Sequence, residues 1–263
     1  MSTRAALLIE YDGTGFIGWQ SQRAAQGVAV QDVLEAAAAR LAGGAPVASA
    51  VAGRTDAGVH AAGQVAMIEL PVIFPVARLA AALNYHLRPH AVVVLRAAPA
   101  PVGWHPRFAA IRRTYRYLIL NRRTRPALLS GRAWHVAAPL DVTVMQAAAR
   151  LLLGRHDFSA FRAAACQAAN PLRTLDRLDV ARADERIEIV AEARSFLHHQ
   201  VRNMVGTLKL VGEGRWPVAR VAEVLDGRDR RAAGPTAPAE GLCLTAVGYA
   251  ADPFADAEKE QSE

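Results

Sequence analysis

The first hundred residues alternate between segments with the apolar periods of strands and of helices. The run from Leu7 to Tyr11 is largely apolar, as in a buried strand, and the segment from Val30 to Leu41 spaces its apolar residues three and four apart, as on one helix face. The same periods predict strands over residues 47–51, 64–70 and 92–96, and a second helix over residues 76–84. This half of the chain therefore predicts one α+β sheet domain.

The second half repeats this order of elements after a proline-rich break. Pro99, Pro101 and Pro106 interrupt regular structure and mark a boundary between domains. Beyond them the clearest strand pattern runs from Tyr115 to Leu120. Further strands are predicted over residues 173–180, 186–193 and 242–249, and helices over residues 142–153, 199–212 and 218–225.

We therefore expect an α+β fold made of two related mixed α/β sheet domains with a cleft between them. The N-terminal domain is assigned to residues 1–105 and the C-terminal domain to residues 106–250. Residues 251–263 are rich in Asp and Glu and contain few apolar side chains, so they predict an acidic, disordered tail.

The charge distribution makes that cleft a basic one. The formal net charge is +7 and the isoelectric point is near 10.1, which favours an anionic partner. Between residues 71 and 140 there is no Asp or Glu, whereas arginine occurs at positions 78, 88, 96, 107, 112, 113, 116, 122, 123, 125 and 132. Arginine suits phosphate and can stack on bases, so nucleic acid is the favoured partner, with a merely solvated basic face as the alternative.

Other composition signals exclude several classes of protein. The two cysteines, Cys166 and Cys243, are isolated, which argues against a disulfide framework and against a zinc site. No apolar run approaches the roughly 20 residues of a membrane-spanning helix, and the first residues lack the pattern of a secretory signal. We expect a soluble, cytoplasmic protein.

The segment from Gly53 to His60 is the most informative for chemistry. It lies between two predicted strands and has the sequence Gly-Arg-Thr-Asp-Ala-Gly-Val-His. Glycine and aspartate are ordinary turn residues, so by composition alone Asp56 could simply cap a tight turn. The longer stretch from Ala52 to Ala61, however, resembles the signature of tRNA pseudouridine synthases of the TruA type.

Further blocks of the chain resemble the same family in the expected order. They cover nearly the whole chain except the acidic tail: residues 11–20, 30–35, 113–117, 154–161, 196–206 and 237–242.

This resemblance implies a reaction and a catalytic residue. A uridine in tRNA is detached from its ribose at N1 and reattached through C5, and the chemistry calls for no metal and no other cofactor. Asp56 matches the family's catalytic aspartate. The sequence leaves open whether Asp56 adds to the base, attacks the sugar carbon or removes a ribose proton.

The resemblance also implies roles for four other residues, each with a plainer alternative. Arg54 matches a position that supports the flipped-out nucleotide, although it could be an ordinary turn or phosphate-binding arginine. Tyr115 matches the active-site tyrosine, which stacks on the base and assists proton movement, or it is a half-buried strand aromatic. Arg202 matches the arginine that pairs with the catalytic aspartate, or it is a helix-surface cation. Leu244 matches a residue that packs on the base.

Three histidines near these motifs suggest a metal site at first sight. His198 and His199 are neighbours, and adjacent residues of a helix point about 100° apart, which suits one ligand set poorly. We expect these two and His60 to be structural or to contact RNA.

By resemblance the substrate is the anticodon stem-loop of tRNA, with uridines at tRNA positions 38, 39 and 40, and the active form is a homodimer. Two other classes compete. A non-catalytic RNA-binding protein would not need Asp56, which repels phosphate in a basic cleft. An aspartate-dependent hydrolase would need a second acid–base carboxylate motif or a metal site, and the sequence contains neither.

Overall fold

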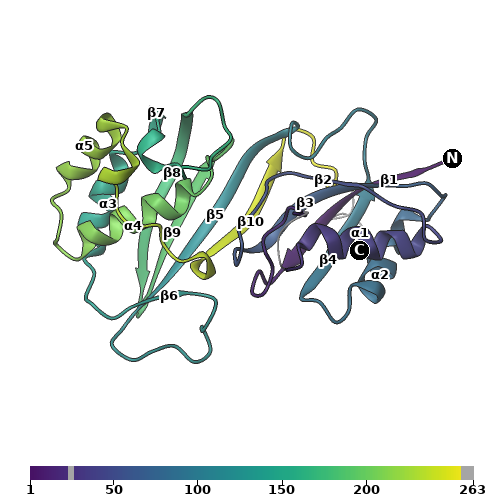
Figure 1. Cartoon of the computed structure of the whole chain (residues 1–263), viewed down its shortest axis with the longest axis horizontal. Coiled ribbons are helices and arrows are strands. Elements are labelled where there is room, and N and C mark those ends of the chain that lie inside the picture. Colours follow the sequence, from purple (N-terminus) through teal and green to yellow (C-terminus); the bar gives the residue numbers. More distant parts are fainter. Residues whose placement is uncertain (23–26, 256–263) are drawn as a thin grey trace. The chain divides into compact units, whose positions relative to one another are not determined.

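The computed structural model describes residues 1–22 and 27–255, which form two compact units. The first unit runs from Met1 to Ile111 and includes the C-terminal segment from Leu244 onward, and the second runs from Arg112 to Cys243. The chain passes from one unit to the other within two strands, β5 (Ala110–Asn121) and β10 (Leu242–Tyr249) (Figure 1).

The first unit is built on an antiparallel sheet. Strand β1 (Thr3–Tyr11) pairs with β4 (Val92–Pro99) on one side and with β3 (His60–Leu70) on the other, and the short β2 (Ser49–Val51) also pairs with β3. The part of β10 in this unit neighbours β3. The backbones approach closely there, since a Cβ on Gly63 would lie 2.3 Å from the Thr245 carbonyl oxygen.

Two helices of the first unit pack against each other and against this sheet. Helix α1 (Val30–Leu41) begins where the Asp32 carboxylate accepts a hydrogen bond from the Ala29 backbone N–H. Helix α2 (Val76–Leu87) buries Leu79, Leu83 and Leu87, which are spaced four apart and therefore share one face. In Figure 1 the two helices lie side by side.

A separate apolar cluster in this unit includes residues on both sides of the proline-rich break. Trp104 and Tyr249 lie 5.3 Å apart between ring centroids, and the Tyr249 hydroxyl donates to the Pro106 carbonyl oxygen at 2.9 Å. Phe254 joins this cluster with only 6% of its surface exposed. Residues 106–111 and 244–255 therefore belong to the first compact unit, in contrast to the predicted division at residue 105. The rest of the predicted tail, residues 256–263, lies outside the described residues.

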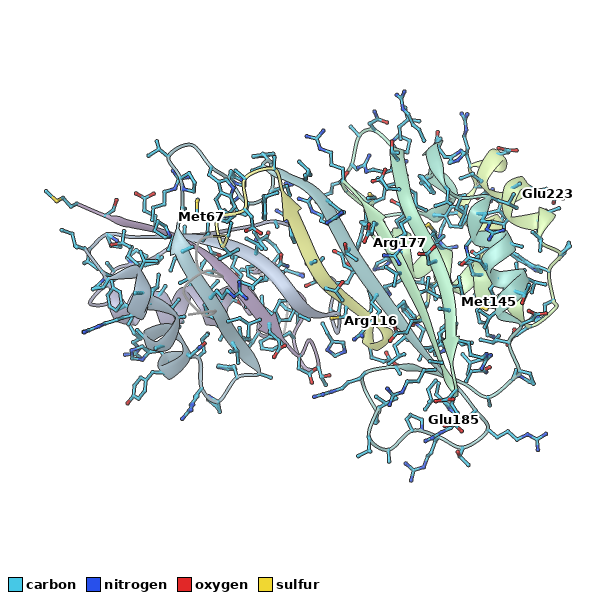
Figure 2. All side chains as sticks on the ribbon, turned by 180° about the vertical axis from the view of Figure 1, so that it is seen from behind. Met67, Arg116, Met145, Arg177, Glu185 and Glu223 are labelled. Atoms are coloured by element: carbon cyan, nitrogen blue, oxygen red, sulfur yellow. The ribbon has the colours of Figure 1, made fainter. Side chains whose placement is uncertain are left out.

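The strands of the second unit pair antiparallel, except for one short parallel strand. Strand β5 pairs with β9 (Arg186–Ala193), β9 with β8 (Leu172–Ala183) and β8 with β7 (Gly154–Asp157), while β6 (Trp134–Val136) runs parallel to β5. Figure 2 labels Arg177 on β8 and Glu185 at the turn between β8 and β9.

Three helices complete the second unit. Helix α3 (Val142–Arg150) is capped by Asp141, whose carboxylate accepts from two backbone N–H groups, and α5 (Ala219–Gly227) ends with a left-handed Arg228. Helix α4 (Gln200–Gly212) is buried along most of its length. It packs on α3 so tightly that a Cβ on Gly212 would lie 2.6 Å from the sulfur of Met145, which Figure 2 labels. Short 3-10 helices cover residues 159–161, 230–232 and 239–241.

The predicted α+β fold is confirmed, and most elements lie where the periods place them. Helix α1 and strands β9 and β10 have the predicted bounds. Strands β6 and β7 were not predicted, because segments of three and four residues are too short to show a period. Within the described residues, no helix combines the length and the apolar character that crossing a membrane demands.

Helix α4 lies against the segment that follows α5, and Gly206 makes this contact possible. A Cβ on Gly206 would lie 1.7 Å from the Pro235 carbonyl oxygen. The Gly234 backbone donates to the Thr207 hydroxyl at 3.0 Å, so the same turn of α4 also binds the segment. The close approach leaves no room for any side chain at position 206.

We predict that Gly206→Ala lowers the free energy of unfolding by about 2 kcal/mol or more, because the backbone at Pro235 must move away. The matched control is Gly227→Ala at the end of α5, where an added Cβ meets no atom within 4 Å. That variant should be neutral or more stable by up to about 1 kcal/mol, as alanine is the better helix former. Urea unfolding monitored by circular dichroism measures both, and equal stabilities would contradict the predicted clash.

Candidate active site

Asp56 lies in an irregular turn between β2 and β3 in the first unit. The Asp56 carbonyl oxygen accepts from the Val59 backbone N–H at 3.1 Å, and Gly58 has a φ of +77°, a conformation that favours glycine. The Asp56 side chain is half-buried, whereas Arg54 is exposed. The turn thus presents a carboxylate and a guanidinium two residues apart.

Buried polar side chains hold this turn from the interior. The Thr55 hydroxyl lies 2.7 Å from the Tyr11 hydroxyl in a buried hydrogen bond. Gln64, with no exposed surface, donates from Nε2 to the Gly53 carbonyl oxygen at 2.7 Å. Because buried polar groups are costly to leave without partners, these bonds give the residues before Asp56 one preferred position.

The loop after β1 holds the same turn from the other side. The Trp19 backbone N–H donates to the Thr55 carbonyl oxygen at 3.1 Å, and the Gly58 N–H donates to the Phe16 carbonyl oxygen at 3.3 Å. A Cβ on Gly18 would lie 2.6 Å from the Thr55 carbonyl oxygen. The glycine-rich loop after β1 therefore provides a surface on which the Asp56 turn packs.

His60 connects the two segments at the base of the turn. Its Nδ1 lies 3.0 Å from the Gly13 backbone nitrogen and 3.1 Å from Oδ1 of Asp12. Its ring is largely covered, with 12% of the side chain exposed. These contacts favour a structural part for His60.

Leu244 also belongs to the first unit, on β10. Its side chain is fully buried.

Tyr115 and Arg202 belong to the second unit. Tyr115 lies on β5 opposite Ala191 of β9, is 8% exposed, and meets the ring of Phe196 edge-on with centroids 5.3 Å apart. This T-shaped contact fixes the plane of the tyrosine ring.

Arg202 lies on the first turns of α4 and is half-buried. Its Nε donates to the Ala237 carbonyl oxygen at 2.7 Å, and its own carbonyl oxygen accepts from the Ala237 backbone N–H at 3.1 Å. The contact to residue 237 therefore orients the arginine.

The segment around Ala237 is itself held by side chains from α4. Asn203 accepts through Oδ1 from the Thr236 hydroxyl at 2.7 Å and from the Arg230 guanidinium at 3.0 Å. Asn203 is fully buried and also donates to the Phe161 carbonyl oxygen at 2.7 Å. Its amide thus uses both ends, as a buried polar group requires.

Tyr117 of β5 holds the next part of this segment. Its hydroxyl donates to the Pro238 carbonyl oxygen at 2.8 Å, and its ring lies where a Cβ of Gly241 would be, 2.5 Å away. Burial raises the pKa of the Tyr117 phenol, the Glu240 carboxylate adds to the rise, and the Arg202 guanidinium opposes it. The phenol therefore stays protonated and remains a donor.

His198 and His199 precede α4. Their ring centroids lie 4.0 Å apart, and His199 has a φ of +63°, which is uncommon for a residue with a side chain. The His198 carbonyl oxygen accepts from the Ala163 backbone N–H at 2.9 Å. The left-handed residue turns the chain into the helix.

The structure brings Arg54 and Asp56 into one turn and places Tyr115 and Arg202 in the other unit. Sequence reasoning missed the residues that support them, above all Gln64 and Asn203. Their signal was a polar side chain inside an otherwise apolar strand or helix face. Periodicity alone treats such a position as a break in the pattern and assigns it no partner.

Comparison with known proteins gives a consistent result across the chain. The model of a family described as tRNA pseudouridine synthase matches residues 7–109 and again residues 148–250, and this double match supports two related domains. The tRNA pseudouridine synthase A of Acidiphilium cryptum is 66% identical over 252 residues, covering 95% of this chain and 98% of its own length. The enzymes of the same name from Paramagnetospirillum magneticum and Gluconobacter oxydans are 56% and 54% identical, covering 94% and 95% of this chain and 96% and 91% of their own lengths. This protein therefore belongs to the tRNA pseudouridine synthase family.

Proposed function

We propose that this protein converts uridine to pseudouridine in the anticodon stem-loop of tRNA, at tRNA positions 38, 39 and 40, with Asp56 as the catalytic group and without a cofactor. The family match and the names of the relatives support the reaction class and the tRNA substrate. The observation that carries the residue assignment is a half-buried carboxylate on a turn held from two sides.

The reaction is an isomerisation whose balance needs only proton transfers. The bond from the ribose C1′ to N1 breaks, a bond from C1′ to C5 forms, the proton on C5 leaves and N1 gains one. No electrons are exchanged with a carrier. Addition to the base, attack on the sugar and removal of a ribose proton each need an ionised carboxylate, which Asp56 supplies.

The fixed position of Asp56 supports this role. A reacting group must be held within a fraction of an ångström of its productive position, because small misplacements cost large factors in rate. The hydrogen bonds to Gly53 and Thr55, together with the glycine contacts at Gly18, restrict the backbone that carries Asp56. A turn that needed only a cap would not require such restriction.

We assign supporting roles to four residues. Arg202 opposes the negative charge of Asp56 and orients its oxygens through a planar fork. Tyr115 stacks on the base and assists proton movement at C5, with its plane set by Phe196. Arg54 supports the nucleotide after it leaves the base stack. Leu244 packs on the base once its neighbours move aside, since its side chain is fully buried in the structure.

A protein that only binds RNA is the main alternative. Binding affinity for a polyanion falls when a carboxylate faces it, so Asp56 and its supporting bonds would be a cost without a benefit. A hydrolase would require another acid–base group. The family match favours the synthase over both alternatives.

We further propose that the enzyme acts in the cytoplasm, as a homodimer. The family resemblance supports both. The expected solution mass is twice the 28.1 kDa of one chain. Light scattering on the purified protein measures this mass, and a value of one chain at micromolar concentration would rule the dimer out.

The first test of the mechanism is Asp56→Asn. The amide keeps the shape of the side chain but is neither nucleophile nor base, so pseudouridine formation should fall by at least about 100-fold. tRNA affinity and thermal stability should remain near those of the wild type. The assay is tritium release from C5-labelled uridine in tRNA.

Asp226→Asn is the matched control, because Asp226 is exposed on α5 and should retain full activity. Turnover by Asp56→Asn above about one hundredth of the wild-type rate would refute the assignment.

The second test compares Arg202→Met with Arg202→Lys. Methionine removes both the charge and the fork, so kcat should fall by about 100-fold, the usual effect of losing one electrostatic partner of a reacting group. Lysine restores the positive charge but not the planar guanidinium, so it should recover only part of the rate. Single-turnover kinetics separates this effect from tRNA binding.

Thermal unfolding must accompany these measurements, because both variants lose the bond from Nε to Ala237. If both have wild-type single-turnover rates, Arg202 is a surface cation and the assigned role is wrong.

A further inference from the structure

An open hollow lies on the first unit between the C-terminal parts of α1 and α2. It has a volume of about 510 Å³, and Arg40, Tyr85, Arg88 and His90 line it. A second hollow of about 430 Å³ shares three of these residues and continues to Val93 of β4. Together they form one surface, here called the α1–α2 hollow, in the size range of small-ligand sites.

The charge of the α1–α2 hollow is positive and uncompensated. Arg40 and Arg88 are exposed, and within residues 1–22 and 27–255 neither guanidinium forms a hydrogen bond or an ion pair. No Asp or Glu lines either part of the hollow. By contrast, Arg122 and Arg220 bind nearby carboxylates at 2.9 and 2.8 Å. The positive charge of the hollow therefore attracts an anion.

A helix-dipole effect explains only part of this arrangement. Arg40 and His86 lie in the last turns of their helices, where a cation stabilises the helix by about 0.3–1 kcal/mol. Arg88 and His90 follow the end of α2, and their presence is not explained by that effect.

Tyr85 adds an exposed aromatic face to the hollow. Its side chain is 75% exposed. The His86 ring lies nearly perpendicular to the Tyr85 ring, with 5.1 Å between centroids. Arginines beside an open aromatic ring are the usual arrangement for holding single-stranded nucleic acid.

The hollow adjoins the loop that supports the Asp56 turn. The His90 ring lies 6.4 Å from the ring of Phe16, and the Phe16 carbonyl oxygen accepts from Gly58 in that turn. The Asp12 backbone N–H also donates to the Ala91 carbonyl oxygen at 3.0 Å. The hollow and the Asp56 turn thus lie in the same unit and both contact the loop after β1.

We propose that the α1–α2 hollow binds the substrate tRNA beside the reacting uridine, with phosphates on Arg40 and Arg88 and an unpaired base stacked on Tyr85. This inference rests on the proposed function, because it assumes a tRNA substrate. The hollow contributes to affinity and takes no part in the chemistry. An open surface that combines two cations with an aromatic face fits a nucleotide strand better than a free phosphate, which would use only the cations.

The test of stacking compares Tyr85→Ala with Tyr85→Phe, using fluorescence anisotropy with an unmodified tRNA transcript. Tyr85→Ala should weaken tRNA binding by about tenfold or more, and Tyr85→Phe should bind within about twofold of the wild type, because it keeps the ring. KM for pseudouridine formation should rise in parallel in Tyr85→Ala. Wild-type affinity and KM in Tyr85→Ala would overturn the stacking.

The test of the phosphate contacts uses the salt dependence of binding. The double variant Arg40→Gln with Arg88→Gln should flatten the slope of log affinity against log salt by about one to two units. Arg150→Gln is the matched control, because Arg150 lies in the last turn of α3 as Arg40 does in that of α1 and is also exposed. If the slope changes by the same amount per arginine in the control and in the double variant, the arginines of the hollow act only through the overall charge of the protein. That result would refute the proposal.

The same assays separate this inference from the proposed function. If the wild-type protein forms no pseudouridine in tRNA, the proposed function fails, and the inference fails with it. If the wild type is active and the hollow variants bind and react like it, only the inference fails.

Discussion

The backbone around Asp56 has no helix or strand of its own, so its position depends on what packs against it. Thr55 and Gly53 bind buried side chains on one side, and the glycine-rich loop after β1 contacts the turn on the other. The hydrogen bonds on the interior side are shielded from water, so losing one leaves a polar group without a partner. The sheet and α1 serve largely to bring these supports together.

In the second unit, buried polar bonds likewise hold the segment that contacts Arg202. The irregular segment from Gly234 to Pro238 binds α4 and β5 through Asn203, Thr207 and Tyr117. Glycines at 206 and 241 allow backbone and ring to approach where a Cβ would collide. In both units a regular element thus holds an irregular segment by a few buried polar bonds together with glycine, a common way to place functional groups on a rigid scaffold.

Electrostatics distinguishes structural arginines from those available to a ligand. Arg230 is engaged inside the second unit, and burial lowers its pKa. Arg40 and Arg88 in the first unit are exposed and have no carboxylate partner among the described residues. Net charge alone treats these arginines alike, whereas their partners show which can neutralise RNA phosphates.

The sequence by itself determined the elements and the family, because periodicity and long motifs are local properties. Helix α1 and strands β9 and β10 follow from spacing, and the segment from Ala52 to Ala61 carries the resemblance. The tertiary structure decided what surrounds the candidate residues: Gln64 beneath the Asp56 turn, Asn203 beside Arg202, and Phe254 in the core of the first unit. It also assigned the end of the chain to the first unit, although the sequence places it far from residues 1–111. These contacts join residues far apart along the chain, and hydrophobic pattern carries no information on which distant backbone group a buried polar side chain will bind.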